Sequence, residues 1–401
     1  MPTFKNFVDF HFLRGVRAFL NLEAGVIRGI PPERQREQAA LKKEREISRL
    51  RKKLAETNIE LDQLTADGRG RDGSDDDVPM FFLIGLPKSG TTWLMRMLNQ
   101  HRDVLCWGEG RFFGRNDRNE TFEKAKINST GHLLRPASLY NTLAESEYLR
   151  LWIERTFWSK DSDVEEHIVR LTREAVRYFL IQKLAESGKK VVGDKTPLPE
   201  ATIVKEIAKI LPEARIIHII RDGRDQAVSH AHHRWNRVRP VEEGGRLTPE
   251  ERGKRDRYRE NPERFLASGE SIFSEQRIVA AAKGWKSNVG HTHREGSALF
   301  GDRYAEVRYE DLLERPEKEL SRLFRFLGAS DDEAIVRQCI ERNRFEKRAQ
   351  RAAGQEDSSS FLRKGVAGDW KSVFTERDRQ VFKEFAGDLL VELGYEESLD
   401  W

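Results

Sequence analysis

Residues 81–93 read FFLIGLPKSGTTW, and this stretch decides the fold. Its first five residues form a continuous apolar run, which is typical of a strand buried on both faces. Gly85 and Gly90 then have the spacing of the G-x-x-x-x-G-K-[ST] phosphate loop, in which backbone N–H groups and a helix N-terminus bind an anion. The residue after Gly90 is Thr91 instead of lysine, and the lysine lies inside the loop as Lys88. The stretch therefore predicts a strand, a phosphate loop and a helix. The loop is expected to hold one phosphate group, with Lys88 beside the bond adjacent to that phosphate.

Beyond this stretch, buried-strand patterns alternate with amphipathic helical patterns. Apolar runs predict strands at 191–193, 215–220 and 303–308. Helical spacing predicts helices at 91–100, 164–187, 198–211, 222–235, 272–289, 316–327, 331–343 and 376–393. Repeated alternation of strands and helices predicts an α/β fold with a parallel, P-loop-type β-sheet flanked by helices.

The chain divides into parts of different composition. Residues 1–65 predict an N-terminal helical extension, amphipathic at first, in which apolar residues after Pro31 recur in alternating steps of three and four, as in a coiled coil. Residues 66–77, ADGRGRDGSDDD, lack periodicity and predict a linker. Residues 78–401 are expected to form the α/β domain, with a polar insertion at about 236–270.

Composition excludes several classes of function. The 71 basic and 67 acidic residues leave a net charge of +4, which gives no basis for a general nucleic-acid binder. Two cysteines, Cys106 and Cys339, exclude a disulfide scaffold and a Cys-rich zinc site. No apolar stretch reaches the roughly 18 to 20 residues that a spanning helix needs. We therefore expect a cytoplasmic protein without nucleic-acid partners.

The N-terminal extension leaves two alternatives open for each of its halves. Its charged half is expected to form homo-oligomers, or to pack as a single helix against the α/β domain. Its Phe-rich first helix is expected to dock on the protein's own core or on a partner subunit, with peripheral contact to a membrane surface as the alternative.

The segment PKSGTTW resembles the 5′-phosphosulfate loop of sulfotransferases that use 3′-phosphoadenosine 5′-phosphosulfate (PAPS). The resemblance implies that Lys88 contacts the bridging oxygen and neutralises the leaving 5′-phosphate. It also implies that backbone and hydroxyl donors hold this phosphate and that Trp93 packs at the adenine. The residues implied in this loop are Pro87, Lys88, Ser89, Gly90, Thr91, Thr92 and Trp93.

Residues 215–229, RIIHIIRDGRDQAVS, resemble the 3′-phosphate element of the same family. A buried strand places Arg221 at its carboxyl edge, and Ser229 follows about two turns into the next helix. The resemblance implies that the charged fork of Arg221 and the hydroxyl of Ser229 converge on one phosphate.

A third segment, residues 362–371, reads LRKGVAGDWK and is similar to the RKGxxGDWK stretch of cytosolic sulfotransferases. The resemblance implies that Arg363, Lys364 and the backbone of Gly365 close over the 3′-phosphate. Tyr309 opens a YED stretch that resembles another family element, whose first residue borders the adenine.

A base is needed to deprotonate an acceptor hydroxyl. Residues 106–113, CWGEGRFF, look like the E-x-x-F-F stretch of carbohydrate-type sulfotransferases, which implies that Glu109 is the general base. A salt bridge from Glu109 to Arg111 or Arg115 is the structural alternative, and His101 is the rival base. Lys195 belongs to a GDKTP segment similar to another family element and is expected to touch the sulfonate or the acceptor.

The resemblance implies a metal-independent sulfotransferase that moves a sulfonate from PAPS to a hydroxyl of a small-molecule, lipid or carbohydrate acceptor, rather than to an amine, and releases 3′-phosphoadenosine 5′-phosphate (PAP). Two alternatives stay open from the residues. One is a P-loop kinase or nucleotide hydrolase, and the other is a non-catalytic nucleotide-binding assembly protein. The mixture of cytosolic-type and carbohydrate-type motifs leaves the acceptor open.

Overall fold

A computed structural model describes residues 78–114, 138–156, 163–197, 202–236, 247–352, 354–357 and 363–401. All of them belong to one compact unit, Asp75–Trp401. The expected N-terminal helical extension, with its oligomer and membrane contacts, and the linker lie outside the described residues. So does the first part of the insertion.

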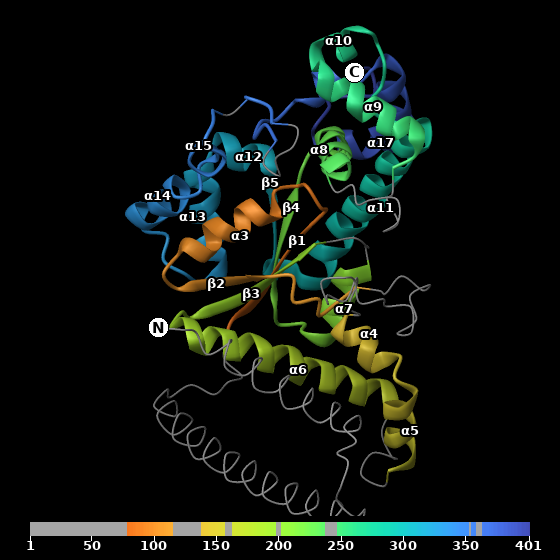
Figure 1. Cartoon of the computed structure of the whole chain (residues 1–401). Helices are drawn as coiled ribbons and strands as arrows, with labels where there is room; N and C mark the ends of the chain where they lie inside the picture. The colour runs from red at the N-terminus through yellow and green to blue at the C-terminus, as the bar shows by residue number, and fades with distance from the viewer. Residues whose placement is uncertain are drawn as a thin grey trace, which may run out of the picture. The chain divides into compact units, whose positions relative to one another are not determined.

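Five parallel strands form a single sheet in the order β2-β3-β1-β4-β5 (Figure 1). The strands are β1 (Met80–Gly85), β2 (Val104–Gly108), β3 (Val191–Pro197), β4 (Arg215–Ile220) and β5 (Tyr304–Arg308). The predicted parallel α/β fold is confirmed. The apolar run that opens the phosphate-loop stretch is the central strand, because β1 pairs with β3 on one side and with β4 on the other.

Helices connect and cover the strands. Those before β4 are α3 (Thr91–Gln100), α4 (Leu139–Ala144), α5 (Glu147–Arg155), α6 (Val164–Ser187) and α7 (Thr202–Ile210). Those between β4 and β5 are α8 (Gly223–Asn236), α9 (Pro249–Glu260), α10 (Pro262–Ala267), α11 (Glu275–Phe300) and the 3₁₀ helix η5 (Gly301–Arg303). The remaining ones are α12 (Tyr309–Glu314), α13 (Pro316–Leu327), α14 (Glu333–Glu341), α15 (Phe345–Ala349), α16 (Trp370–Val373) and α17 (Glu376–Glu392).

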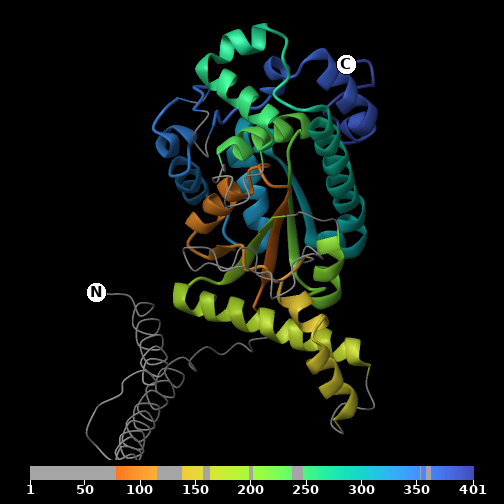
Figure 2. The same cartoon turned by 45° about the vertical axis from the view of Figure 1, so that its right-hand side comes forward.

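Side-chain alternation along β1 builds a core on each face of the sheet. Phe81 and Leu83 pack with residues of α3, α13 and α14, whereas Phe82 and Ile84 pack with residues of α6 and α7 on the other face. All four side chains are fully buried. Figures 1 and 2 both show α6 lying across one end of the strands, with α11 running along the sheet. Successive residues of a strand point to opposite faces, so a strand between two helical layers must be apolar throughout.

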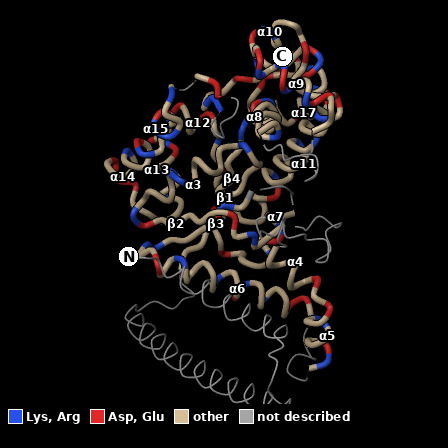
Figure 3. Tube along the Cα trace, in the orientation of Figure 1, with Lys and Arg blue, Asp and Glu red and all other residues tan. Residues whose placement is uncertain are grey.

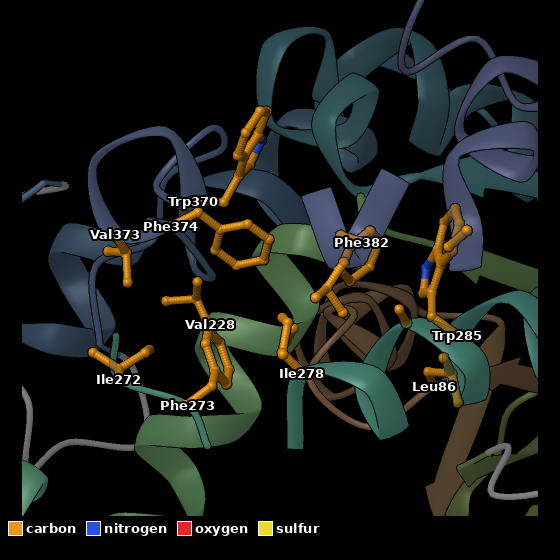
Figure 4. Close-up of a cluster of buried hydrophobic side chains, with 14 of the residues drawn as sticks. Leu86, Val228, Ile272, Phe273, Ile278, Trp285, Trp370, Val373, Phe374 and Phe382 are labelled. Atoms are coloured by element: carbon orange, nitrogen blue, oxygen red, sulfur yellow. The ribbon is translucent and has the colours of Figure 1, made fainter. Parts of the chain in front are cut away.

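A third apolar cluster joins the insertion to the C-terminal helices (Figure 4). Val228 of α8, Trp285 of α11 and Phe382 of α17 belong to it, together with Tyr258 and Phe265 from α9 and α10. The described part of the insertion is polar, as predicted, but it also contributes to the core. Its two helices are polar on average, but each buries an aromatic side chain in this cluster.

Among the described helices, none combines the length and the apolar character needed to cross a membrane.

Candidate active site

The loop after β1 forms an open anion-binding turn at the start of α3. Gly90 is the N-cap residue of α3, and within the described part of the chain no side chain caps this helix and its first turn holds no acidic residue. The first N–H groups of a helix have no intrahelical acceptor, and the helix dipole places partial positive charge there. The N-terminus of α3 is thus free of the groups that would compete with an anion.

Gly90 is required at this turn for two reasons. Its φ is +94°, in the region that L side chains rarely adopt, and an added Cβ would lie 2.6 Å from Cδ2 of Tyr309. The Tyr309 ring, buried at the start of α12, packs against the loop and lies 5.7 Å from the Trp93 ring. The loop and the YED segment are therefore in contact, although more than 200 residues separate them in the sequence.

One cavity of about 480 Å³ opens beside this turn. That volume lies within the range of pockets for small ligands, about 300–1,000 Å³. Eleven of the residues implied by the three motif segments and the YED segment line it: Lys88, Gly90, Thr91, Thr92, Trp93, Arg221, Ser229, Tyr309, Arg363, Lys364 and Gly365. Two residues implied in the loop do not line it. Pro87 is exposed, with its carbonyl accepting a hydrogen bond from Gln226 at 2.8 Å, and Ser89 is buried in the turn.

Arg221 ties the segments together at the cavity wall. Its Nη1 donates to the carbonyl of Lys88 at 3.1 Å, and its Nη2 donates to the carbonyl of Val366 at 3.2 Å. The guanidinium carbon lies 4.5 Å from the centre of the Tyr309 ring. Its Nε is buried and has no hydrogen-bond partner among the described residues. A buried donor of this kind on a cavity wall fits an anionic ligand, because an unsatisfied N–H costs about 1–3 kcal/mol.

Arg363 and Lys364 also line the cavity and are held by carboxylates. Arg363 donates through Nη2 to Asp369, and Lys364 donates through Nζ to Oδ1 of Asp369 at 2.6 Å. Burial would raise the pKa of Asp369, but the two adjacent cations outweigh it and lower this pKa. The loop that follows is fixed by Asp225, whose carboxylate accepts the N–H groups of Gly368 at 2.7 Å and of Trp370 at 2.9 Å.

Glu109 and Lys195 form a separate pair at the carboxyl ends of β2 and β3, outside the lining of this cavity. The side chain of Glu109 is 49% exposed, whereas that of Lys195 is 6% exposed. The backbone N–H of Glu109 also donates to the carbonyl of Lys195 at 2.9 Å. Glu109 thus lies at the surface of the described domain. Among the described residues, Glu109 forms its ion pair with Lys195 and not with Arg111, and Arg115 lies outside the described residues.

Backbone strain marks both loops. Within the described residues, four non-glycine positions have positive φ, and they include Lys88 at +77° and Glu109 at +58°. Such conformations cost about 1–3 kcal/mol and concentrate at functional sites. The strained backbone supports functional roles for Lys88 and Glu109, and this support does not depend on any sequence motif.

His101 lies at the other end of α3 and does not reach the cavity. It is fully buried, its Nε2 is 2.8 Å from the carbonyl of Ser330, and its Nδ1 accepts the N–H of Asp103 at 3.0 Å. Both ring nitrogens are therefore occupied, which makes Nε2 the protonated atom. Burial lowers the pKa of His101. The prediction of His101 as the rival base is therefore wrong. Its two hydrogen bonds instead hold the C-terminal end of α3 in place.

The cavity also includes residues that the sequence reading missed. Asn343 lines it from the segment between α14 and α15, Phe345 lines it from the start of α15, and Arg96 lines it from α3. Trp93 donates its indole N–H to the carbonyl of Asn343 at 2.9 Å. No sequence motif includes Asn343 or Phe345, so neither could have been predicted to line the cavity. Only Arg96 could have been predicted from its spacing, because it lies one turn after Trp93 on α3.

No cluster of three or more His, Cys, Asp or Glu side chains suited to a metal ion occurs among the residues that the structure describes. Basic residues are interspersed with acidic ones along the described chain (Figure 3). The positive charge at the cavity is thus a local feature.

The chain was compared with known proteins. The family model described as "Sulfotransferase domain" matches residues 78–394. Sulfotransferase 1A1 of Bos taurus is 28% identical over 200 residues, which cover 47% of this chain and 58% of the relative. Sulfotransferase 1B1 of Canis lupus familiaris is 26% identical over 212 residues, which cover 49% of this chain and 62% of the relative. The chain thus spans less than two thirds of the length of these curated relatives.

Among solved structures, mouse sulfotransferase SULT7A1 complexed with PAP is similar to this chain at 17% identity. The match covers 81% of this chain and 87% of that chain, with a TM-score of 0.42.

Proposed function

Because this chain belongs to the sulfotransferase family, we propose that it transfers a sulfonate group from PAPS to an acceptor hydroxyl and releases PAP. One observation supports the proposal most strongly. The cationic side chains Lys88, Arg221 and Lys364 line one cavity, although they come from three segments far apart in the sequence.

The donor substrate would be held at its two anionic ends. Arg221, Ser229, Arg363 and Lys364 would bind the 3′-phosphate, and the open N-terminus of α3 with Thr91 and Thr92 would bind the 5′-phosphosulfate. The unpartnered Nε atoms of Arg221 and Arg363 support this arrangement, since each is buried and lacks an acceptor among the described residues. Trp93 and Phe345 would flank the adenine, because aromatic faces suit a base.

Lys88 would stabilise the leaving group. In sulfonate transfer the acceptor oxygen forms a bond to sulfur while the bond from sulfur to the 5′-phosphate oxygen breaks, so negative charge develops on that oxygen. A cation placed in advance at this oxygen lowers the barrier without reorganisation. The positive φ of Lys88 supports this role, because it turns the residue within the loop that lines the cavity.

Glu109 would accept the proton that the acceptor hydroxyl loses, and Lys195 would orient its carboxylate and face the sulfonate. The support is the ion pair between them at the carboxyl edge of the sheet, the edge where α/β folds bind ligands. The exposure of Glu109 leaves it accessible to an acceptor.

The acceptor class stays a proposal: a hydroxyl of a small molecule, a lipid or a carbohydrate. A cytoplasmic location, independence from metal ions and self-association through residues 1–65 are likewise proposals that rest on the sequence alone.

The experiment supplies PAPS with a panel of hydroxyl acceptors and follows PAP release and acceptor mass. We expect turnover in the presence of a chelator, and we expect Lys88→Ala and Glu109→Gln to reduce kcat at least about a hundredfold. Lys318→Ala and Glu174→Gln remove the same charges from exposed positions of α13 and α6 and serve as controls. Full turnover by either site variant would contradict its assigned role.

Two arms of the same experiment separate the alternatives. Hydrolysis of ATP or phosphate transfer from ATP that requires Mg²⁺ would favour a kinase or nucleotide hydrolase. Binding of PAP without turnover on any acceptor would favour a non-catalytic nucleotide-binding protein.

A further inference from the structure

The cationic wall of the cavity belongs to a closed network of four charged side chains. Besides their bonds to Asp369, Arg363 places Nη1 3.1 Å from Oε1 of Glu356, and Lys364 places Nζ 3.3 Å from Oε2 of Glu356. Each cation therefore faces both carboxylates, and the formal charge of the four groups is zero. Arg363 and Lys364 line the cavity, whereas Glu356 and Asp369 are not among its described lining residues.

The insertion fixes Glu356 in this position. Tyr258 of α9, which is fully buried, donates its hydroxyl to the carboxylate of Glu356, with both oxygens at 3.2 Å. The centre of the His232 ring lies 5.0 Å from that of the Tyr258 ring, and its Nδ1 lies 4.0 Å from Oε1 of Glu356. The insertion thus reaches the cationic wall of the cavity through Glu356.

We propose that Glu356 is a built-in counter-charge that weakens the binding of a 3′-phosphate at Arg363 and Lys364. This inference rests on the proposed function. The carboxylate touches the same two cations that the phosphate would contact, and two charges of the same sign that share a cation repel each other. Glu356 acts through Arg363 and Lys364 and is a positioning residue.

The two carboxylates of the network, Asp369 and Glu356, have different roles. Asp369 is almost completely buried and accepts hydrogen bonds from both cations, so its loss would release both side chains. Glu356 is less buried, with its side chain 19% exposed. If its charge is removed, Arg363 and Lys364 keep their bonds to Asp369, and their positive charge becomes available to the ligand.

The magnitude follows from Coulomb's law. A carboxylate in contact with the cations lies roughly 7 Å from a phosphate on their other side, and at effective dielectric constants of about 40–80 one charge there changes the affinity about threefold to tenfold. A group that only stabilises the fold would not produce a change confined to ligands that carry a 3′-phosphate.

The counter-charge of Glu356 also affects the release of the product during turnover. PAP keeps the 3′-phosphate, so the counter-charge weakens the binding of PAP as well as that of PAPS. Product release limits the turnover of many enzymes, and a weaker hold on the 3′-phosphate favours release.

The test measures the dissociation constants of PAP and of AMP by isothermal titration calorimetry. AMP shares the adenosine and the 5′-phosphate with PAP but lacks the 3′-phosphate. We expect Glu356→Gln, which keeps the shape and an acceptor for Tyr258, to bind PAP about threefold to tenfold more tightly and AMP within twofold of the original chain. Glu356→Ala removes the same charge without keeping the shape, and it is expected to raise the ratio of PAP affinity to AMP affinity in the same direction.

Asp357→Asn is the matched control, because it removes one carboxylate at the next position, where the ion pair is with Arg351 at 3.9 Å instead of with the cavity cations. An unchanged or lowered affinity ratio in both Glu356 variants, in a chain that binds PAP, would overturn the counter-charge while leaving the proposed function in place. If the original chain binds no PAP, the proposed function fails and this inference fails with it.

Discussion

Replacing Gly90 by alanine tests whether the loop and the Tyr309 ring act as one unit. The substitution places a Cβ 2.6 Å from Cδ2 and 3.1 Å from Cε2 of Tyr309, at a φ of +94°. The left-handed backbone costs alanine about 1–2 kcal/mol, and the steric overlap adds about 1–3 kcal/mol. The reduced freedom of the unfolded chain offsets about 0.4–1 kcal/mol of this.

Gly328→Ala provides the control. Gly328 ends α13 with a φ of +75°, and a Cβ there would meet nothing within 4 Å. It shares the backbone cost but lacks the overlap, so Gly90→Ala is expected to lower the free energy of unfolding by about 1–3 kcal/mol more than Gly328→Ala.

Urea unfolding measures this difference, and calorimetric titration with PAP measures its effect on the cavity. The ring that the new Cβ displaces lies against the guanidinium of Arg221, so we expect Gly90→Ala to weaken PAP binding at least about tenfold, which is 1.4 kcal/mol. Gly328→Ala should leave PAP binding unchanged. Equal losses of stability in the two variants, or full PAP affinity in Gly90→Ala, would refute the packing argument.

Three further predictions concern the groups around the cavity. Arg221→Gln should weaken PAP binding by about 2–3 kcal/mol, because a charged hydrogen bond to the 3′-phosphate is lost, and AMP binding much less; equal losses for both nucleotides in calorimetry would place the 3′-phosphate elsewhere. Asp225→Asn should lower the free energy of unfolding by about 1–3 kcal/mol in urea titrations, because an amide replaces a buried carboxylate that accepts two backbone N–H groups, and a variant as stable as the original chain would count against this. Burial and, to a smaller extent, the nearby Arg363 lower the pKa of His232 well below 6.5. Below pH 6.5 the unfolded chain therefore binds a proton at His232 that the folded chain does not bind, and the free energy of unfolding falls as the pH drops. His232→Phe should reduce this fall by up to about 1.4 kcal/mol per pH unit in urea titrations between pH 6.5 and 5, and an unchanged slope would contradict the assignment.

The fold was predictable where the pattern is local. Residues 81–85 are apolar throughout because β1 is covered on both faces, and the amphipathic spacing of α6 matches its observed bounds, Val164–Ser187. The strand β2 was missed, because only the first three of its five residues are buried and its apolar run is correspondingly short. The helices α9 and α10 were missed because a largely polar sequence hides the two aromatic residues, Tyr258 and Phe265, that dock them.

The candidate site was predictable where short sequence motifs contain the residues proposed to bind the ligand. The three motif segments give Lys88, Arg221 and Arg363, which meet at one cavity. The pairing of Glu109 with Lys195 was not predictable, because it depends on the register between β2 and β3. The misplacement of His101 has a geometric cause. Ten helical residues separate it from the loop, about 15 Å along the axis of α3.

The most direct test of the central claim is a calorimetric titration of the full chain with PAP in the presence of a chelator. The account predicts one PAP bound per chain without a divalent cation, with AMP bound at least about tenfold more weakly because it lacks the 3′-phosphate. The account would be contradicted if PAP did not bind, or if AMP bound as tightly as PAP.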